Sequence, residues 1–217
     1  MVRLNRKDCG YWLPLLLLLL LFPMGCQSAA LSQVTANLEV EAAAVEGPTD
    51  LTSPVAAEEA EPPVALQIAE LGLALDVVPM GWVVTDVNGQ TTTEWIIPTE
   101  AAGWHVNSAK AGAAGNLILS GHQIVGDAVF APLALGDITV GQELTITDAA
   151  GATFLYRITE VSEPVPILGA TEEDINLARS YLQPSEAPIL TMMTGWPDFT
   201  TTHRIFAVAE LVERAGS

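Results

Sequence analysis

The sequence predicts a mainly β domain, either a sandwich or a closed barrel, from residue 64 to the C-terminus. In this part of the chain, short runs rich in Val, Ile, Leu and Thr alternate with segments that contain Gly, Pro, Asn and Asp. Short runs at close spacing are typical of sandwiches and barrels, whose strands are half or fully buried. Seven runs are predicted to be strands, at residues 65–68, 75–79, 116–120, 143–147, 153–163, 189–194 and 205–212.

Residues 1–26 have the pattern of an export signal. Basic side chains precede a Leu-rich run over residues 13–24, which is shorter than the roughly 20 residues that a spanning helix needs. The pair Gly25-Cys26 resembles a bacterial lipoprotein signal, in which Cys26 would carry the lipid. Ordinary cleavage after the small residues 28–30 and an uncleaved membrane anchor stay open as alternatives. All three place the domain outside the cytoplasmic membrane, anchored to it or secreted.

Residues 27–63 are predicted to form a disordered tether. The segment consists largely of Ala, Glu, Thr, Ser and Pro, carries seven acidic residues and has no basic one. Such a composition buries too little apolar surface to fold, and like charges extend the chain. The sequence therefore predicts three parts: a signal over residues 1–26, a tether over 27–63 and a β domain over 64–217.

Helices are predicted at few places in the β domain. Thr171 with three following acids is a plausible N-cap, leading into a helix over 175–182. Residues 129–135 predict a short helix that contains Pro132, and residues 99–102 predict a single helical turn. Residues 148–151, which end in Gly, predict a hairpin turn between two of the strands.

The charge of the chain excludes one class of partner and its cysteines exclude one kind of chemistry. The chain has 26 acidic and 8 basic residues, a net charge of −18, and would repel a phosphate backbone, so we expect no nucleic-acid binding. The two cysteines, Cys9 and Cys26, both precede the β domain. The domain therefore has no disulfide, thiolate metal site or cysteine nucleophile.

His122 is the first candidate for a functional side chain. It follows the predicted strand 116–120, and Gly121 between them permits a tight bend that would turn the imidazole toward a cleft. A histidine near neutral pKa in such a place is a candidate general acid or base. A hydrogen-bonded loop histidine is the alternative for any single histidine.

The domain resembles the sortases, the cysteine transpeptidases of bacterial cell surfaces, and most of all their short single-domain type from environmental bacteria. The resemblance covers residues 64–212 and implies a closed eight-stranded β-barrel with a few short helices. The matching motifs are Glu94-Trp-Ile-Ile-Pro98, Ala102-Gly-Trp-His105, Gly115-Asn-Leu-Ile-Leu-Ser-Gly-His122, Val129-Phe-Ala-Pro-Leu133, Leu190-Thr-Met-Met-Thr-Gly-Trp-Pro197 and Thr202-His-Arg204.

The resemblance implies an active site in which one member is replaced. His122 matches the histidine of the family and Arg204 its arginine, whereas Gly195 stands at the position of the nucleophilic cysteine. In the family the thiolate attacks a threonyl carbonyl, the arginine stabilises the oxyanion and the histidine protonates the leaving amine. Glycine has no side chain, so the resemblance implies a pseudo-transpeptidase. Its partners would be sorting peptides of surface proteins or cell-wall components, with the membrane reached through the N-terminal anchor.

Other residues near Gly195 complete the predicted site. Trp196 and Thr194 are predicted to contact substrate in the groove. An active transpeptidase or hydrolase with a non-cysteine nucleophile is the alternative function, but the Thr194 hydroxyl is predicted to face away from the cleft and Ser120 has no evident base. His105 and His203 are predicted to be structural, and we expect neither a metal nor a cofactor.

Overall fold

The computed structural model describes residues 54–215, except residues 57, 58 and 88. The predicted export signal with Cys26, and the predicted tether as far as residue 53, lie outside the described residues. For the end of the tether the prediction of disorder is wrong, because Val55 pairs with Ala113, Ala60 is buried and Pro63 begins a strand. No helix within the described part of the chain is both long and apolar enough to cross a bilayer.

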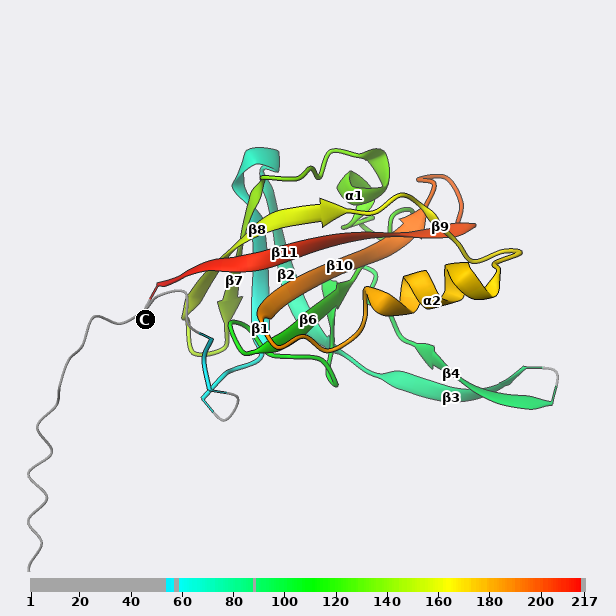
Figure 1. The fold of residues 1–217 in the computed structure, drawn as a ribbon, viewed down its shortest axis with the longest axis horizontal. Coiled ribbons are helices and arrows are strands. Elements are labelled where there is room, and N and C mark those ends of the chain that lie inside the picture. The colour runs from blue at the N-terminus through cyan, green and yellow to red at the C-terminus, as the bar shows by residue number, and fades with distance from the viewer. Residues whose placement is uncertain (1–53, 57–58, 88, 216–217) are drawn as a thin grey trace, which may run out of the picture. The chain divides into compact units, whose positions relative to one another are not determined.

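Eight strands form a closed barrel (Figure 1). Neighbours follow the order β10-β6-β5-β2-β1-β7-β8-β11, and β10 then pairs with β11, which closes the ring. The predicted closed eight-stranded barrel is therefore confirmed. The strands are β1 (Pro63–Ile68), β2 (Leu73–Met80), β5 (Ala102–His105), β6 (Gly115–Ser120), β7 (Glu143–Asp148), β8 (Thr153–Val161), β10 (Pro188–Trp196) and β11 (His203–Ala215).

The remaining elements lie outside this ring. β3 (Trp82–Val87) and β4 (Gln90–Trp95) form a separate hairpin that projects from the barrel (Figure 1). The short β9 (Val165–Pro166) pairs with the start of β11. The helices are η1 (Ala69–Leu71), α1 (Ala131–Leu135) and α2 (Glu172–Ser180).

All seven predicted strands are present, whereas one predicted helical turn is wrong. Residues 99–101 form bends, and Ala102 begins β5, which pairs in parallel with the end of β2. That long-range pairing overrides the local preference for a helix, which a single turn cannot sustain. β3, β4, β5 and β9 were not predicted: β5 and β9 are very short, and both strands of the hairpin are largely exposed.

The predicted caps and turns are confirmed. Thr171 caps α2, because its hydroxyl accepts the Asp174 N–H at 3.2 Å while the Asp174 carboxylate accepts the Thr171 N–H at 2.8 Å. Between β7 and β8, the Gly151 N–H donates to the Asp148 carbonyl at 3.0 Å, and Gly151 has a φ of 87°. That positive φ favours glycine.

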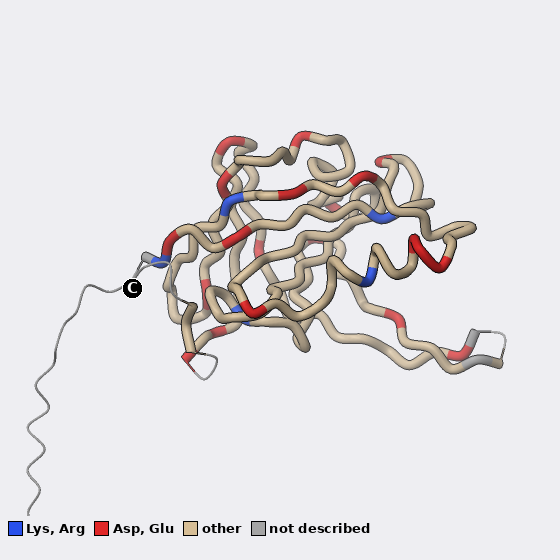
Figure 2. Tube along the Cα trace, viewed as in Figure 1, with Lys and Arg blue, Asp and Glu red and all other residues tan. Residues whose placement is uncertain are grey.

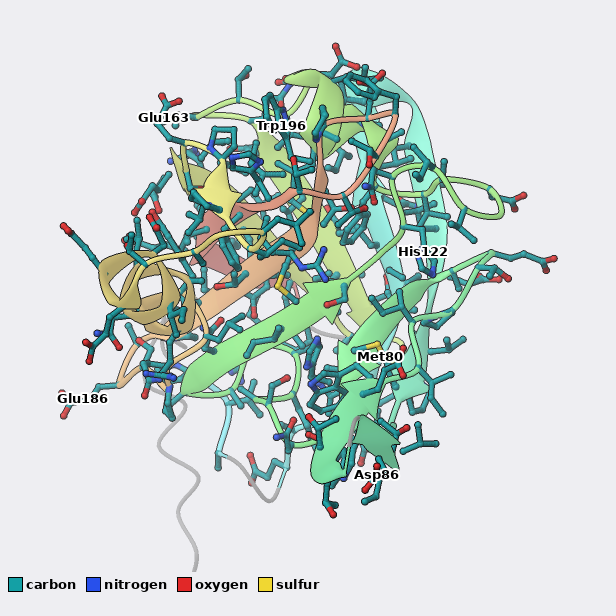
Figure 3. The ribbon with its side chains drawn as sticks, turned by 90° about the vertical axis from the view of Figure 1, so that its right-hand side faces the viewer. Met80, Asp86, His122, Glu163, Glu186 and Trp196 are labelled. Carbon is teal, nitrogen blue, oxygen red and sulfur yellow. The ribbon has the colours of Figure 1, made fainter. Side chains whose placement is uncertain are left out.

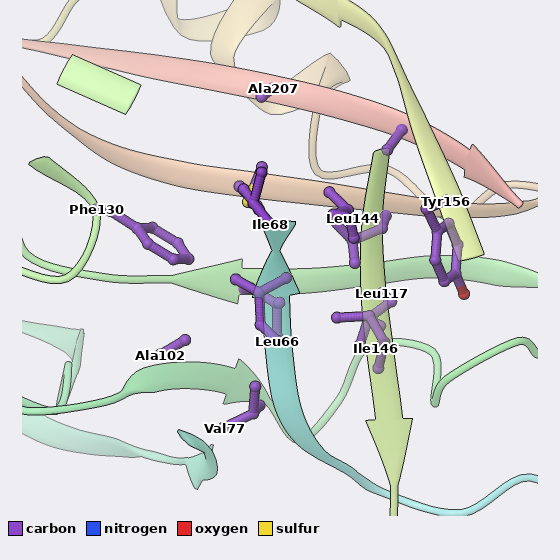
Figure 4. Packing of buried hydrophobic residues seen from close by; sticks show 14 of the residues in the cluster. Leu66, Ile68, Val77, Ala102, Leu117, Phe130, Leu144, Ile146, Tyr156 and Ala207 are labelled. Atoms are coloured by element: carbon purple, nitrogen blue, oxygen red, sulfur yellow. The ribbon is translucent and has the colours of Figure 1, made fainter. Parts of the chain in front are cut away.

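The core fills the inside of the barrel (Figure 4). Leu66 and Ile68 of β1 and Leu144 and Ile146 of β7 are fully or almost fully buried, two residues apart in each strand. This spacing places each pair on the inner face of its strand. Burying a side chain of this size stabilises the fold by about 1.5–3 kcal/mol. The packed interior fixes the strand ends, and the candidate site lies at one of these ends.

Candidate active site

Two strand pairings bring the predicted site residues together. β6 and β10 are parallel, with Ser120 opposite Met193, and the Gly121 N–H donates to the Met193 carbonyl at 3.3 Å. β10 and β11 are antiparallel, and Gly195 lies directly opposite Arg204. The loop after β6, the end of β10 and the start of β11 therefore meet at one end of the barrel, as the resemblance predicted for residues 122, 195 and 204.

Two adjoining cavities open at this end of the barrel, and both are lined by His122 and Arg204. The smaller has a volume of about 230 Å³ and also contacts Gly195, Gln123 and Thr201. The larger, of about 570 Å³, extends to the β3–β4 hairpin, where Glu94 and Trp95 line it. Figure 3 faces this side of the molecule, with His122, Trp196 and Asp86 of the hairpin labelled.

His122 is held by the backbone of the segment that follows the hairpin. Its Nε2 lies 3.3 Å from the Ile97 carbonyl oxygen. A carbonyl only accepts, so Nε2 carries a hydrogen and Nδ1 of the neutral ring is an acceptor. This placement requires glycine at position 121, because the backbone packs closely there. A Cβ on residue 121 would lie 2.7–2.9 Å from the Phe130 ring and the Val129 side chain. The ring is half-buried and lines both cavities.

Arg204 is a half-buried cation without a counter-charge. Among the described residues its guanidinium takes part in no hydrogen bond and no ion pair, and the one ion pair between described side chains joins Arg157 to Glu143. Burial lowers the pKa of Arg204 from its ordinary value, since a low-dielectric surrounding disfavours the charged form. Its five N–H groups are therefore free to bind an oxygen ligand in the cavity.

Gln123 fills the space in front of Gly195. A Cβ built on Gly195 would lie 2.8 Å from Gln123 Cδ and Oε1 and closer still to Nε2. The carboxamide is fixed there, because Nε2 donates to the Thr200 carbonyl at 3.0 Å and to the Thr201 hydroxyl at 2.7 Å. Gln123 is buried, with 6% of its surface exposed. Sequence reasoning missed this residue, since its role depends on a contact between the β6–α1 and β10–β11 loops.

Thr194 and Trp196, the two neighbours of Gly195 in the chain, make different contacts from each other. Thr194 lines the smaller cavity, but its buried hydroxyl donates to the Gly121 carbonyl at 2.8 Å and holds the loop after β6. Trp196 packs edge-on against His203, with ring centroids 5.3 Å apart, and lines neither of the two cavities. Substrate contact by Trp196 and Thr194 stays a prediction.

A second polar pair lies beside the larger cavity. His105 Nε2 and the Ser120 hydroxyl are 2.7 Å apart, both side chains are buried, and both line this cavity. Burial lowers the pKa of His105 to about 4, so the ring is neutral at pH 7. Trp95 packs on the ring, with centroids 4.2 Å apart. The expectation that Ser120 lacks a nearby base is therefore wrong, because the β5–β6 pairing brings residues 15 apart into contact.

The described residues contain no group of three His, Cys, Asp or Glu side chains arranged to hold a metal ion. The arrangement at the barrel end is instead an imidazole and a guanidinium facing a common cavity. Such a pair stabilises negative charge on an oxygen and exchanges a proton. Gly195, which lies between their strands, offers no atom for covalent catalysis.

Comparison with known proteins agrees with this geometry. The family model of the sortase domain matches residues 66–212. Sortase C1 of Streptococcus suis has 16% identity and a TM-score of 0.50, with 73% of this chain and 77% of that chain covered. A lid mutant of Streptococcus agalactiae sortase C1 has 12% identity and a TM-score of 0.50, with 71% of each chain covered.

At such low identities these two structures establish the fold alone. No curated protein sequence matches the chain. The family model, however, spans most of the chain, including the loop after β6, the end of β10 and the start of β11, which carry His122, Gly195 and Arg204. The chain therefore belongs to the sortase family.

Proposed function

We propose that this protein is an extracytoplasmic sortase-like domain that binds extended peptides without covalent chemistry. The observation that carries the proposal is the pair Gly195 and Gln123. The position of the nucleophile has no side chain, and the carboxamide of Gln123 takes up the space that a side chain there would need. Covalent catalysis requires a nucleophilic atom at this point, and the β domain has no cysteine.

The rest of the site supports binding. His122 and Arg204 line cavities that together run from Gly195 to the β3–β4 hairpin. Extended peptides bind such grooves through apolar contacts along their length and a few fixed polar groups. The larger cavity offers both, since Trp95, Ile97 and Met193 line it beside the two polar groups. Its ligand would be a sorting peptide of a surface protein or a cell-wall component.

Location is part of the same proposal. The export pattern of residues 1–26 and the acidic tether, here proposed for residues 27–53, would hold the domain outside the cytoplasmic membrane, on a lipid at Cys26 or as a secreted protein. Peptide ligands at a cell surface are accessible to a domain placed in this way. The tether would give the groove a reach of several nanometres, because a flexible chain of this length spans about 5–6 Å times the square root of its residue number.

The test is peptide binding by the full chain together with a search for covalent adducts. Fluorescein-labelled heptapeptides from a positional-scanning library are titrated with the protein, and anisotropy is recorded. We expect binding that Arg204→Gln and His122→Ala weaken and that the exposed, charge-matched control Arg179→Gln leaves unchanged. Intact-mass spectra should show no acylated protein. An adduct on the chain, or binding that no groove substitution weakens, would contradict the proposal.

One observation favours a second candidate function, a serine-dependent hydrolase. The Ser120 hydroxyl lies 2.7 Å from His105 Nε2, and a serine hydroxyl next to a neutral histidine is an arrangement that supports nucleophilic attack. Two features favour peptide binding over this serine-dependent hydrolase. The lowered pKa of His105, about 4, makes the ring a weak base, and only 1% of the Ser120 surface is exposed. Hydrolysis of p-nitrophenyl acetate that Ser120→Ala abolishes, and Thr191→Ala leaves intact, would establish this candidate.

A further inference from the structure

If the groove binds peptides, as proposed above, the charge of Arg204 bears on the charge of the peptide. Arg204 brings a full positive charge to both cavities, and the described residues give it neither an ion pair nor a hydrogen bond. An unpaired charge removed from water raises the free energy of the folded protein. The cost is offset when a ligand supplies the counter-charge.

The lining of the smaller cavity strengthens this point. Its residues include Arg204 and His122 but neither an Asp nor a Glu, and the remaining lining groups are neutral. In the larger cavity the only acidic lining residue is Glu94, an exposed residue of the hairpin. Acidic residues are spread along the described chain (Figure 2), and the loops next to the site contain Asp127 and Asp198, but neither of these two lines the cavities. The barrel end around Gly195 is a cationic site in a protein whose net charge is −18.

Glycine at position 195 also affects the charge around Arg204. A cysteine thiolate opposite Arg204 would place negative charge near the guanidinium, whereas Gly195 contributes none. Gln123, which fills the space, is neutral, and its amide N–H groups are directed to Thr200 and Thr201. The guanidinium thus keeps an unmatched charge that a carbonyl oxygen, with only a partial charge, neutralises incompletely.

We propose that the groove selects peptides that present a carboxylate to Arg204, with His122 contributing a second hydrogen bond. A carboxylate fits the planar guanidinium with two parallel hydrogen bonds and neutralises it. His122 adds its Nδ1–H when the ring is protonated, since its Nε2 faces the Ile97 carbonyl. The carboxylate has two sources, a free peptide C-terminus or an Asp or Glu side chain, and both offer the same chemistry.

Three fluorescein-labelled forms of one peptide test the proposal on the full chain. The peptide is the best neutral, C-terminally amidated binder from the library; the second form has a free C-terminus, and the third is amidated with one internal Glu. We expect at least one acidic form to bind about tenfold or more tightly than the neutral form, the usual range for a charge-assisted hydrogen bond. General electrostatics predicts the reverse, because the protein is strongly acidic.

Two variants of Arg204 and one control variant assign the effect. Arg204→Gln should remove the preference for the acidic peptide, Arg204→Lys should retain part of it, and the exposed control Arg179→Gln should retain all of it. Equal affinity for all three forms would overturn the carboxylate inference and leave the peptide-binding function standing. A preference that survives Arg204→Gln would also overturn it. If no peptide form binds at all, the proposed function fails together with this inference.

Discussion

The carboxamide of Gln123 lies where the side chain of residue 195 would lie if that residue were not glycine. The contact is specific, since a Cβ on Gly195 would meet three atoms of the Gln123 side chain and no other residue comes as close. Two hydrogen bonds to residues 200 and 201 hold the carboxamide in place. Any side chain at position 195 would therefore require the Gln123 carboxamide to move.

Restoration of the nucleophile is predicted to need two substitutions. In Gly195→Cys the new side chain must displace Gln123 from both hydrogen bonds, whereas Gly195→Cys/Gln123→Ala has room for it. In the double variant, the guanidinium of Arg204 should favour the thiolate and lower the pKa of the thiol. We expect the double variant to react with iodoacetamide at pH 7 several-fold faster than the single variant.

Peptide mapping by mass spectrometry follows the label at position 195, because Cys9 and Cys26 of the full chain also react. Ser185→Cys, at a partly exposed position outside the two cavities of the site, is the reference thiol. Equal rates for the single and double variants would show that Gln123 does not control access. A rate in the double variant no higher than that of Ser185→Cys would show that the groove no longer activates a thiol.

Gln123 is also predicted to hold the β10–β11 loop. Gln123→Ala removes both hydrogen bonds to that loop, which should lower the free energy of unfolding by about 1–2 kcal/mol. Local opening should increase as well, so backbone amides in residues 198–202 should exchange hydrogen faster. Hydrogen-exchange mass spectrometry measures the second effect and urea unfolding the first.

Gln183→Ala is the matched control. Gln183 also donates its amide to a backbone carbonyl, that of Arg179 at 3.2 Å, but it is exposed and distant from the β10–β11 loop in sequence. We expect it to leave exchange over residues 198–202 unchanged. Unaltered exchange in Gln123→Ala itself would mean that the loop is held by its other contacts, such as the hydrogen bond from the Thr202 N–H to the Trp196 carbonyl.

The strand pattern predicted a sandwich or a barrel, the resemblance to sortases implied the closed eight-stranded barrel, and the structure brings the three predicted site positions to one end of it. Alternating burial in strands such as β7 leaves a pattern in the sequence, and His122, Gly195 and Arg204 lie in motifs that are local in the chain. Gln123 and the His105–Ser120 pair leave no such pattern. Each depends on a contact between segments far apart in sequence, and on side-chain orientations that only packing determines.

The β3–β4 hairpin was missed for a different reason. Its apolar residues are exposed, with 47% of Trp82 and 67% of Val84 accessible, so one buried face does not alternate with one polar face. The hairpin turn does have a local signal, since Gly89 has a φ of 80° and its N–H donates to the Asp86 carboxylate at 2.8 Å.

Acid is predicted to destabilise the protein through His105. Burial lowers the pKa of His105 to about 4 from an ordinary value of 6.5, so the unfolded chain binds a proton at a higher pH than the folded protein does. The stabilising effect is fully present above about pH 6.5 and is lost as the pH falls toward 4. From a shift of this size, the loss amounts to roughly 3 kcal/mol. Urea unfolding at several pH values between 7 and 4 measures it.

Substitution separates this effect from the titration of the many carboxylates. His105→Gln keeps a polar group beside Ser120 but cannot titrate, so its stability should fall less steeply between pH 6.5 and 4 than that of the unsubstituted protein. His203→Gln, at a half-buried histidine that pairs with Thr202, should keep the full slope. If His105→Gln and the unsubstituted protein show the same slope, His105 titrates in the folded protein as it does in the unfolded chain. The lowered pKa assigned to His105 would then be wrong, and the case for Ser120 as a nucleophile would strengthen, because His105 would be a stronger base.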